Sequence, residues 1–376
     1  MAAARILLMY ITEVSGHHSA TLAIEKGIRI LSPQTEILNI NAFNYTNPVS
    51  ERIVNRLYMS VIKMTPRIWD YLYDNSRIVK KIQAIKETVH RLNSPKLKKL
   101  FDHFKPDVIA CSQAFPCGMV ADFKKTTGSS IPLVAVLTDH VPHSYWIYDT
   151  IDYYVAPSEE VALRLTRKGV PAEKIKPLGI PFDPKFNQPL SRSAIARRLG
   201  LDPEKLTILI MGGGHGLGPI KSIVKSLESV KNDFQEIIVT GINRKLYRSL
   251  KKTASQCKKK VLVFDFVNNV NELMAVSDII VTKPGGITTA EATANSLPMI
   301  IVHPIPGQEA NNTAYLIAKG AAIKIDNAKD INIVVENLIS DPYRLQDLRQ
   351  GAMRIAKPHA SLDIARLLLN LAGKNA

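Results

Sequence analysis

The chain has 376 residues, of which 46% are hydrophobic and 22% charged, and its formal net charge is +16. This composition is typical of a globular protein, and the length predicts two domains. Three cysteines (Cys111, Cys117 and Cys257) are too few and too scattered for a disulfide framework, so we expect reduced thiols. No apolar run reaches the roughly 20 residues that a membrane-spanning helix needs, and the short N-terminal run does not predict a signal peptide. We therefore expect a protein that is soluble or lies on a membrane surface.

Short runs of β-branched and aliphatic residues alternate with helical patterns along most of the chain. The strands predicted in the first half are 6–11, 36–40, 107–112, 133–138 and 153–156. Those predicted in the second half are 207–211, 236–240, 261–266, 278–282, 299–302 and 322–325. Predicted helices include 19–31, 218–229, 310–318 and 361–371. This alternation predicts an α/β fold in which helices cover parallel sheets.

The pattern restarts once, after a Pro-rich and then polar stretch at 184–205 that we predict to be a linker. The linker separates a Rossmann-like domain at 1–183 from a second one at 206–355. The last segment, 356–376, is predicted to be helical and to return to the first domain. Because open parallel sheets bind ligands outside the carboxyl ends of their strands, the loops at those ends are the candidate binding sites.

Positive charge is concentrated between residues 51 and 105, which contain 13 Lys and Arg against 5 Asp and Glu. Within 53–64 apolar residues recur at helical spacing, flanked by Arg52, Arg56 and Lys63, and Trp69 follows. A basic, aromatic and amphipathic segment is typical of a helix that lies on an anionic lipid surface. An ordinary surface helix packed on a core is the alternative. No nucleic-acid motif accompanies the charge, so a nucleic-acid partner is not expected.

Two loops rich in glycine follow predicted strands of the second domain. The first, Ile210-Met-Gly-Gly-Gly-His-Gly-Leu-Gly-Pro-Ile220, allows close backbone approach to a ligand, and the next helix N-terminus suits a diphosphate. A tight turn or another dinucleotide site would look the same. In the second, Val281-Thr-Lys-Pro-Gly-Gly-Ile-Thr-Thr-Ala-Glu-Ala292, a helix is predicted to start near Thr288, which would cap it or reach phosphate. Glu291 then either chelates a ribose diol or compensates the helix dipole.

Two further loops carry polar side chains. Pro304-Ile-Pro-Gly-Gln-Glu-Ala-Asn-Asn312 offers Gln308, Glu309 and Asn312, a mixture of donors and acceptors suited to sugar hydroxyls. Leu137-Thr-Asp-His-Val-Pro-His-Ser-Tyr-Trp146 contains two histidines and Asp139, but the spacing matches no zinc pattern, so no metal site is predicted. Near the N-terminus, Thr12-Glu-Val-Ser-Gly-His-His-Ser-Ala-Thr21 places two adjacent histidines on a turn before a helix.

Taken together, these motifs resemble those of monogalactosyldiacylglycerol synthases and bacterial processive diacylglycerol glucosyltransferases. "MGGGHGLGPI", "TKPGGITTAEA" and "PIPGQEANN" resemble the donor-domain motifs, and "VSGHHSA" resembles the Gly-Gly-His segment near the N-terminus of these enzymes. "NPVSERIVNRLYM" and "VLTDHVPHSYWIYDTIDYYVAPSEEV" resemble segments of the acceptor domain. The resemblance runs from about residue 5 to residue 370. The chain departs from the family at Val14-Ser15, where relatives usually have glycines.

The resemblance implies a GT-B fold, in which two Rossmann-like parallel-sheet domains face each other across a cleft. It also implies a UDP-sugar donor, an inverting mechanism, and neither a cofactor nor a catalytic metal. Mapped by motif, His17 is the expected general base, and Asp139 would orient His17 or the acceptor. The resemblance assigns the following residues to donor binding: Gly16, Gly213, Gly214, Gly218, Gly285, Gly286 and Thr288 near the diphosphate, Glu291 at the ribose, and Gln308, Glu309 and Asn312 around the sugar.

A neutral imidazole suits the general-base role near neutral pH, and the helix dipole at its position disfavours the imidazolium form. We therefore expect His17 to take the hydroxyl proton of diacylglycerol while a hexose, galactose or glucose, moves from UDP. The basic 45–105 segment would dock the enzyme on the anionic inner face of the cell membrane, as a cytoplasmic peripheral protein. The alternatives are an N-acetylglucosamine transferase acting on a peptidoglycan lipid precursor and a non-enzymatic nucleotide-sugar sensor.

Overall fold

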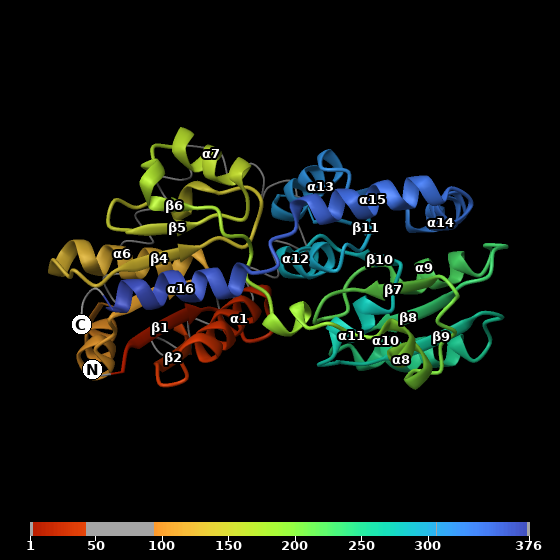
Figure 1. Cartoon of the computed structure of the whole chain (residues 1–376), viewed down its shortest axis with the longest axis horizontal. Coiled ribbons are helices and arrows are strands. Elements are labelled where there is room, and N and C mark those ends of the chain that lie inside the picture. Colours follow the sequence, from red (N-terminus) through yellow and green to blue (C-terminus); the bar gives the residue numbers. More distant parts are fainter. Residues whose placement is uncertain (1–2, 43–93, 306, 374–376) are drawn as a thin grey trace. The chain divides into compact units, whose positions relative to one another are not determined.

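The structure is a computed structural model that describes residues 3–42, 94–305 and 307–373. The amphipathic helix predicted at 53–64 and most of the basic 45–105 segment lie outside the described residues. The chain divides into two compact units (Figure 1). The first comprises Met1–Pro184, Ile305–Gln308 and His359–Ala376, and the second comprises Lys185–Pro304 and Glu309–Pro358.

The first unit contains a six-stranded parallel sheet with the strand order β2-β1-β3-β4-β5-β6. Its elements are β1 (Arg5–Tyr10), α1 (Gly16–Leu31), β2 (Glu36–Asn41), a helix at 94–104, β3 (Val108–Cys111), α6 (Ala114–Thr127), β4 (Leu133–Val136), β5 (Tyr153–Val155), α7 (Glu159–Arg167), β6 (Ile175–Lys176) and α16 (Ala360–Gly373). From β1 the chain moves to β2 on one side and later to β3 on the other. The strand order therefore reverses between β1 and β3. Such a reversal is called a topological switch point, and parallel sheets of this kind bind ligands beside it.

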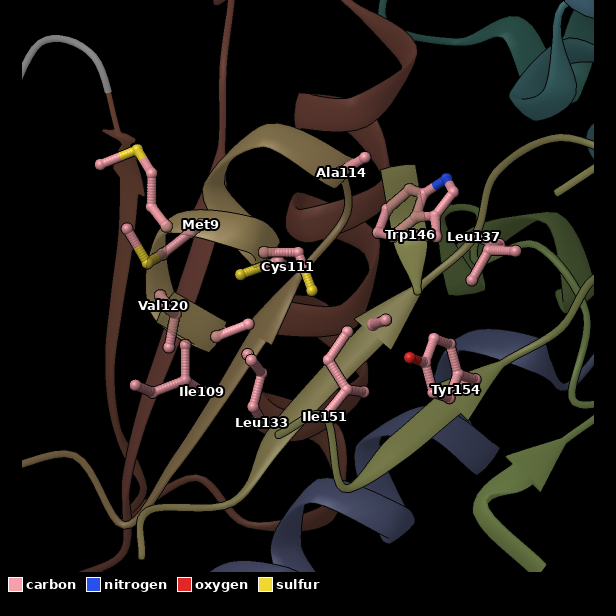
Figure 2. Packing of buried hydrophobic residues seen from close by; sticks show 14 of the residues in the cluster. Met9, Ile109, Cys111, Ala114, Val120, Leu133, Leu137, Trp146, Ile151 and Tyr154 are labelled. Carbon is pink, nitrogen blue, oxygen red and sulfur yellow. The ribbon is translucent and has the colours of Figure 1, made fainter. Parts of the chain in front are cut away.

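Helices cover both faces of this first sheet. On one face α1 and α16 pack together and contribute Ile24, Ile28 and Leu368 to the core. Gly27 permits their close approach, because a Cβ there would lie 2.7 Å from the Ser361 carbonyl oxygen. The other face packs on α6, where Val120 lies close to Ile109 and Leu133 (Figure 2). Burial on both faces explains why these strands are continuous aliphatic runs rather than alternating ones.

The second unit contains a second six-stranded parallel sheet, with the order β12-β11-β10-β7-β8-β9. Its elements are α8 (Arg192–Arg198), β7 (Thr207–Met211), α9 (Ile220–Leu227), β8 (Gln235–Val239), α10 (Arg244–Ala254), β9 (Lys260–Phe264), α11 (Val270–Ala275), β10 (Ile279–Thr282), α12 (Gly286–Ala294), β11 (Met299–Val302), α13 (Gln308–Ala318), β12 (Ala322–Ile325), α14 (Ile331–Ser340) and α15 (Pro342–Ile355). Here the order reverses between β7 and β10. Each unit thus has one switch point.

The predicted parallel α/β architecture is confirmed, with strands at 207–211, 299–302 and 322–325 matching the structure without a shift. Sequence analysis missed β6, which has only two residues, and α8, which lies inside the stretch predicted as a linker. The helix start near Thr288 is wrong: α12 begins at Gly286 with Gly285 as its N-cap. No helix among the described residues is long and apolar enough to cross a membrane.

Candidate active site

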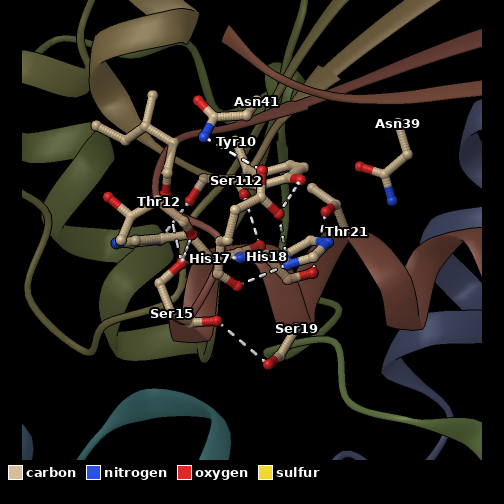
Figure 3. Close-up of polar contacts among 12 residues, drawn as sticks. Tyr10, Thr12, Ser15, His17, His18, Ser19, Thr21, Asn39, Asn41 and Ser112 are labelled. Carbon is tan, nitrogen blue, oxygen red and sulfur yellow. Dashed lines mark hydrogen bonds and ion pairs between the residues drawn. The ribbon is translucent and has the colours of Figure 1, made fainter. Parts of the chain in front are cut away.

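The loop between β1 and α1 is fixed by a side-chain cap. Ser15 is the N-cap of α1, and its Oγ accepts a hydrogen bond from the His18 backbone N–H at 3.2 Å (Figure 3). The same hydroxyl donates to the Thr12 carbonyl oxygen at 2.6 Å, and Thr12 itself has a left-handed φ of 70°. Serine is a preferred N-cap residue, so the sequence itself specifies where α1 begins. The cap makes Gly16 and His17 the first two residues of α1.

His17 is held across the switch point of the first sheet. Its Nδ1 lies 2.8 Å from the backbone carbonyl oxygen of Ser112, directly after β3, and the Ser112 hydroxyl donates to the His17 carbonyl oxygen at 2.9 Å (Figure 3). A carbonyl oxygen only accepts, so Nδ1 carries the hydrogen of this bond. In the neutral ring Nε2 is then the unprotonated nitrogen. This tautomer leaves Nε2 able to accept a proton.

The electrostatic surroundings keep His17 neutral near physiological pH. Burial lowers its pKa below the ordinary 6.5, while the Asp139 carboxylate and the Ser112 hydrogen bond oppose this by raising the pKa. Asp139 follows β4, and its Oδ2 accepts a hydrogen bond from Gln308 Nε2 at 3.1 Å. Thr138, the preceding residue, places Oγ1 3.2 Å from His17 Nδ1. The structure therefore places Asp139 where its charge acts on His17, as an orienting or tuning group requires.

His18 belongs to a separate set of contacts on the same loop. Its ring stacks on Tyr10 with centroids 4.1 Å apart and planes inclined by 10°, and its Nδ1 lies 2.7 Å from the Glu13 carbonyl oxygen. Tyr10 in turn donates its hydroxyl to Glu13 Oε2 at 2.8 Å. The Nδ1 atom of His18 therefore contacts the loop that leads to α1, and the face of its ring contacts Tyr10 at the end of β1. His18 stiffens this loop, whereas His17 is anchored on β3.

The other histidine-bearing loop of the first unit forms no metal cluster. Trp146 is buried in the core, and the His143 ring lies 5.6 Å from the Tyr145 ring and 6.0 Å from the Trp146 ring. Burial, opposed only weakly by Glu160, lowers the pKa of His140 to about 4. Across the described ranges, no group of three or more His, Cys, Asp or Glu residues is arranged to hold a metal ion.

The glycines of the β7–α9 loop separate into two kinds. At Gly216 a Cβ would lie 2.0 Å from the Thr240 carbonyl oxygen, so this glycine is needed for packing of the loop itself. Gly213 and Gly218 also have positive φ, 68° and 106°, but a Cβ at either would meet nothing within 4 Å. Open space over a glycine backbone is what close approach of a ligand requires. Gly213 and Gly218 are therefore the better candidates for donor contact.

Two helix N-termini meet at the switch point of the second sheet. β7 and β10 are paired at Met211 and Thr282, so the helices that follow them, α9 and α12, begin at the same edge. Neither helix has a side-chain cap or an acidic residue in its first turn, and a Cβ at Gly285 would meet nothing within 4 Å. Uncapped N–H groups and two dipoles with their positive ends together suit a diphosphate.

The polar stretch at 304–312 is bonded to the glycine-rich stretch at 281–292. Lys283 Nζ forms an ion pair with Glu309 Oε1 at 2.8 Å, and Asn312 Nδ2 donates to the Pro284 carbonyl oxygen at 3.0 Å. Asn312 is fully buried, so in this structure it fixes the loop around Gly285. Thr288 and Glu291, both partly buried, lie on the first turns of α12.

Sequence analysis missed Ser112, Thr138 and Lys283. The available signal for Ser112 and Thr138 was a polar residue just after a buried strand, β3 for Ser112 and β4 for Thr138. The available signal for Lys283 was its position between a strand and a Gly-Gly turn. The structure brings His17 and Asp139 together with Gln308 in the first unit. In the second unit Gly213, Gly214, Gly218 and Gly285 lie on strand-to-helix loops, Gly286, Thr288 and Glu291 lie on α12, and Glu309 and Asn312 lie on α13.

Two parallel sheets of six strands, each with its polar loops at a switch point, are the architecture of the GT-B fold. MurG of Acinetobacter baumannii superposes with a TM-score of 0.62 at 13% identity, over 97% of this chain and 99% of that one. HepE of Anabaena, solved with UDP-glucose, superposes with a TM-score of 0.53 at 13% identity, over 99% and 98% of the two chains.

Sequence comparison places the chain more narrowly. Residues 17–182 match the family profile of monogalactosyldiacylglycerol (MGDG) synthase, and residues 207–363 match the C-terminal domain of glycosyltransferase family 28. The processive diacylglycerol β-glucosyltransferase of Bacillus cytotoxicus is 31% identical over 368 residues, covering 97% of this chain and 93% of its own. The chain belongs to this family of hexosyltransferases, which confirms the resemblance seen in its motifs.

Proposed function

We propose that this chain transfers a hexose from a UDP-sugar to the free hydroxyl of diacylglycerol, with inversion at the anomeric carbon and His17 as the general base. The observation that carries the proposal is the hydrogen bond from His17 Nδ1–H to the Ser112 carbonyl, which leaves Nε2 as the basic nitrogen. In the proposed step Nε2 takes the acceptor proton while the acceptor oxygen forms a bond to C1 of the sugar. The bond from C1 to the UDP oxygen breaks, and UDP leaves with the electron pair.

The donor would be bound by the second unit. The uncapped N-termini of α9 and α12 supply N–H groups for the diphosphate. These groups would counter the charge that develops on the leaving UDP, so we expect no catalytic metal and no other cofactor. HepE, which shares the fold, is bound to UDP-glucose in its own structure. Gly213, Gly218 and Gly285 are the proposed points of closest backbone approach.

Relatedness favours diacylglycerol as the acceptor. The B. cytotoxicus relative, named a diacylglycerol glucosyltransferase, is 31% identical to this chain, whereas MurG shares its fold at 13% identity. The name of that relative also favours glucose over galactose. Because diacylglycerol resides in the bilayer, the enzyme would work as a peripheral protein on the cytoplasmic face of the membrane, with the basic 45–105 segment as one point of contact.

The test is a product assay with purified protein and vesicles that contain diacylglycerol and an anionic lipid. UDP-glucose, UDP-galactose and UDP-N-acetylglucosamine are supplied in parallel, and the anomeric configuration of any glycolipid is read by proton NMR. We expect one monohexosyl lipid with a β linkage from one hexose donor. An α-linked product would contradict the inverting mechanism. Product formed only from UDP-N-acetylglucosamine and a peptidoglycan lipid precursor would contradict the proposed acceptor.

A further inference from the structure

One helix of the second unit has an outer face made only of cations. Between Gly241 and Phe264 the chain contains eight Lys and Arg and no Asp or Glu. Five of these cations lie on α10, which packs beside β9 (Figure 1), and the other three are at 258–260, beyond its end. The cations are Arg244, Lys245, Arg248, Lys251, Lys252, Lys258, Lys259 and Lys260. All except Lys259 are exposed. We call the five exposed cations on the helix itself (Arg244, Lys245, Arg248, Lys251 and Lys252) the α10 cationic face.

The spacing on α10 gathers its cations on one side. At about 100° per residue, positions 244, 245, 248, 251 and 252 fall within an arc of about 120°. The opposite side carries Leu246, Tyr247 and Leu250, which belong to or pack against the hydrophobic core of the second unit. Core packing therefore explains the apolar residues on the buried side of α10. It does not explain the cations on the outer side.

Nor do helix energetics explain the α10 cationic face. Arg244 and Lys245 lie in the first turn, where the helix dipole disfavours positive charge, and that turn has no acidic residue. Arg248 lies four residues from both Arg244 and Lys252, a spacing at which like charges repel. By contrast α7 begins with Glu159 and Glu160 and carries its arginines later, as the dipole favours. Lys251 and Lys252 lie in the last turn, where the dipole favours them, so the unfavourable features are the two cations of the first turn and the like charges four residues apart.

The α10 cationic face also lacks counter-charges in the described structure. None of its five members forms an ion pair with any described residue. Lys251 lies over the Tyr247 ring, 5.8 Å from its centroid. Of the acids near Lys258, Glu228 accepts from the Lys258 backbone N–H, and Glu236 is fully buried. Burial, with the charge of Glu228, raises the pKa of Glu236 to about 8, so near neutral pH it adds little negative charge.

We propose that the α10 cationic face is a docking surface for an anionic lipid bilayer, located on the donor-binding unit and separate from the 45–105 segment. The charge is complementary to such a surface, and long Lys and Arg side chains reach lipid phosphates without deep insertion. The proposal rests on the proposed function insofar as a bilayer-resident acceptor requires the enzyme at that surface. Nucleic acid is the other polyanion, and the test includes it.

The test compares two triple variants of the full chain. Arg248→Gln/Lys251→Gln/Lys252→Gln removes three charges from the α10 cationic face, and glutamine retains helix propensity. Arg344→Gln/Arg354→Gln/Lys357→Gln removes the same charge from exposed positions of the same unit, in a region that also contains Asp341 and Asp347. Circular dichroism and thermal unfolding establish that both variants fold. Co-sedimentation with phosphatidylcholine vesicles, with and without phosphatidylglycerol, measures binding.

We expect the α10 variant to bind phosphatidylglycerol vesicles about a hundredfold more weakly than the parent at low salt, since each cation near an anionic surface contributes about a factor of five. The matched variant should change binding by less than about threefold. Equal loss in both variants would overturn the proposal. So would unchanged vesicle binding with selective loss of affinity for a single-stranded RNA oligonucleotide, which would identify nucleic acid as the partner.

Activity on diacylglycerol dispersed in neutral detergent micelles separates this proposal from the proposed function. The α10 variant should match the parent there, because no anionic surface is present. If the parent forms no glycolipid in micelles or vesicles, the proposed function fails while the vesicle-binding result still decides the docking surface. If the parent is active and the α10 variant loses activity in neutral micelles, α10 acts on turnover itself and the docking proposal is wrong.

Discussion

The two switch points of this molecule differ in the groups that form them: side chains at the first and backbone at the second. At the first, between β1 and β3, the site is made by side chains: His17 Nδ1 lies 2.8 Å from the Ser112 carbonyl oxygen and 3.2 Å from Thr138 Oγ1. Ser15 caps α1 there by accepting from the His18 backbone N–H at 3.2 Å. At the second, between β7 and β10, the functional surface is backbone: glycines with open space above them and two helix N-termini without side-chain caps.

The difference follows from the chemistry that each site would perform. A base must present one nitrogen in one tautomer, which requires directional contacts from side chains and a carbonyl. A diphosphate is large and carries its charge over several oxygens, so repeated backbone N–H groups bind it well without any particular side chain. Substitutions should therefore separate catalysis from donor binding according to the unit in which they fall.

The largest effect is expected for His17→Ala. Loss of the general base should lower kcat by about 10²- to 10⁴-fold, with UDP affinity unchanged because the donor loops lie in the second unit. Turnover of the glycolipid and calorimetric titration with UDP measure the two quantities. His103→Ala, at an exposed histidine of the first unit, is the matched control and should retain activity. A large loss of UDP affinity in His17→Ala would break the proposed separation.

Gly216→Ala should damage the fold of the donor loop. The new Cβ would lie 2.0 Å from the Thr240 carbonyl oxygen, at a φ of 57° that L residues rarely adopt. We expect the free energy of unfolding to fall by about 2 kcal/mol or more, measured by urea denaturation. Unchanged stability would show that the loop does not need glycine at this position.

Gly285→Ser should lower UDP affinity without lowering stability, in contrast to Gly216→Ala. Serine is a preferred N-cap residue, so the free energy of unfolding should stay the same or rise by a few tenths of a kcal/mol. The new hydroxyl would occupy N–H groups of α12 that we propose for the diphosphate, and UDP affinity should fall about tenfold, equivalent to about 1.4 kcal/mol. An unaltered UDP dissociation constant in a stable Gly285→Ser protein would argue against phosphate binding at this helix.

Ser15→Ala removes the N-cap of α1 and should lower the free energy of unfolding by about 1 kcal/mol. Because the cap also positions His17, kcat should fall as well. Ser158→Ala is the control, since Ser158 caps α7 by accepting from the Val161 N–H at 3.4 Å, away from His17. It should cost similar stability and leave kcat unchanged. Equal kcat in both variants would mean that the cap serves folding alone.

The smallest effect is a displacement of the pH profile. The base acts when unprotonated, so kcat/KM should rise with pH through the His17 pKa, which burial places below 6.5. The Asp139 charge raises this pKa, and Asp139→Asn should therefore move the acid limb to lower pH while the Asn carbonyl still accepts from Gln308. A limb that moves to higher pH would contradict the assigned direction of the Asp139 effect.

Local patterns were sufficient to predict much of the fold. The aliphatic runs predicted 11 of the strands within a few residues, because strands buried on both faces must be continuously apolar. Glycine clusters after strands predicted the donor loops. The start of α12 was missed because glycine at the first position of a helix gives no cap signal, and the two residues of β6 are too few for a periodic pattern.

Contacts between distant segments were beyond sequence reasoning. Ser112 is 95 residues from His17, and only the strand order β2-β1-β3 brings the two together. The tautomer of His17 depends on that contact, so it was equally inaccessible. The division of glycines into packing and open positions likewise required the Thr240 carbonyl, which comes from the neighbouring strand end. The ion pair of Lys283 with Glu309 joins two loops whose separate motifs gave no sign of it.

The most direct test of the central claim is the tautomer of His17 in the free enzyme. Nitrogen-15 NMR of protein labelled on its histidine rings, recorded above the acid limb and assigned by comparison with His17→Ala, reports which ring nitrogen carries the proton. We predict a neutral ring with the proton on Nδ1 and an unprotonated Nε2. A proton on Nε2 would contradict the account, because the nitrogen proposed to accept the acceptor proton would already be occupied.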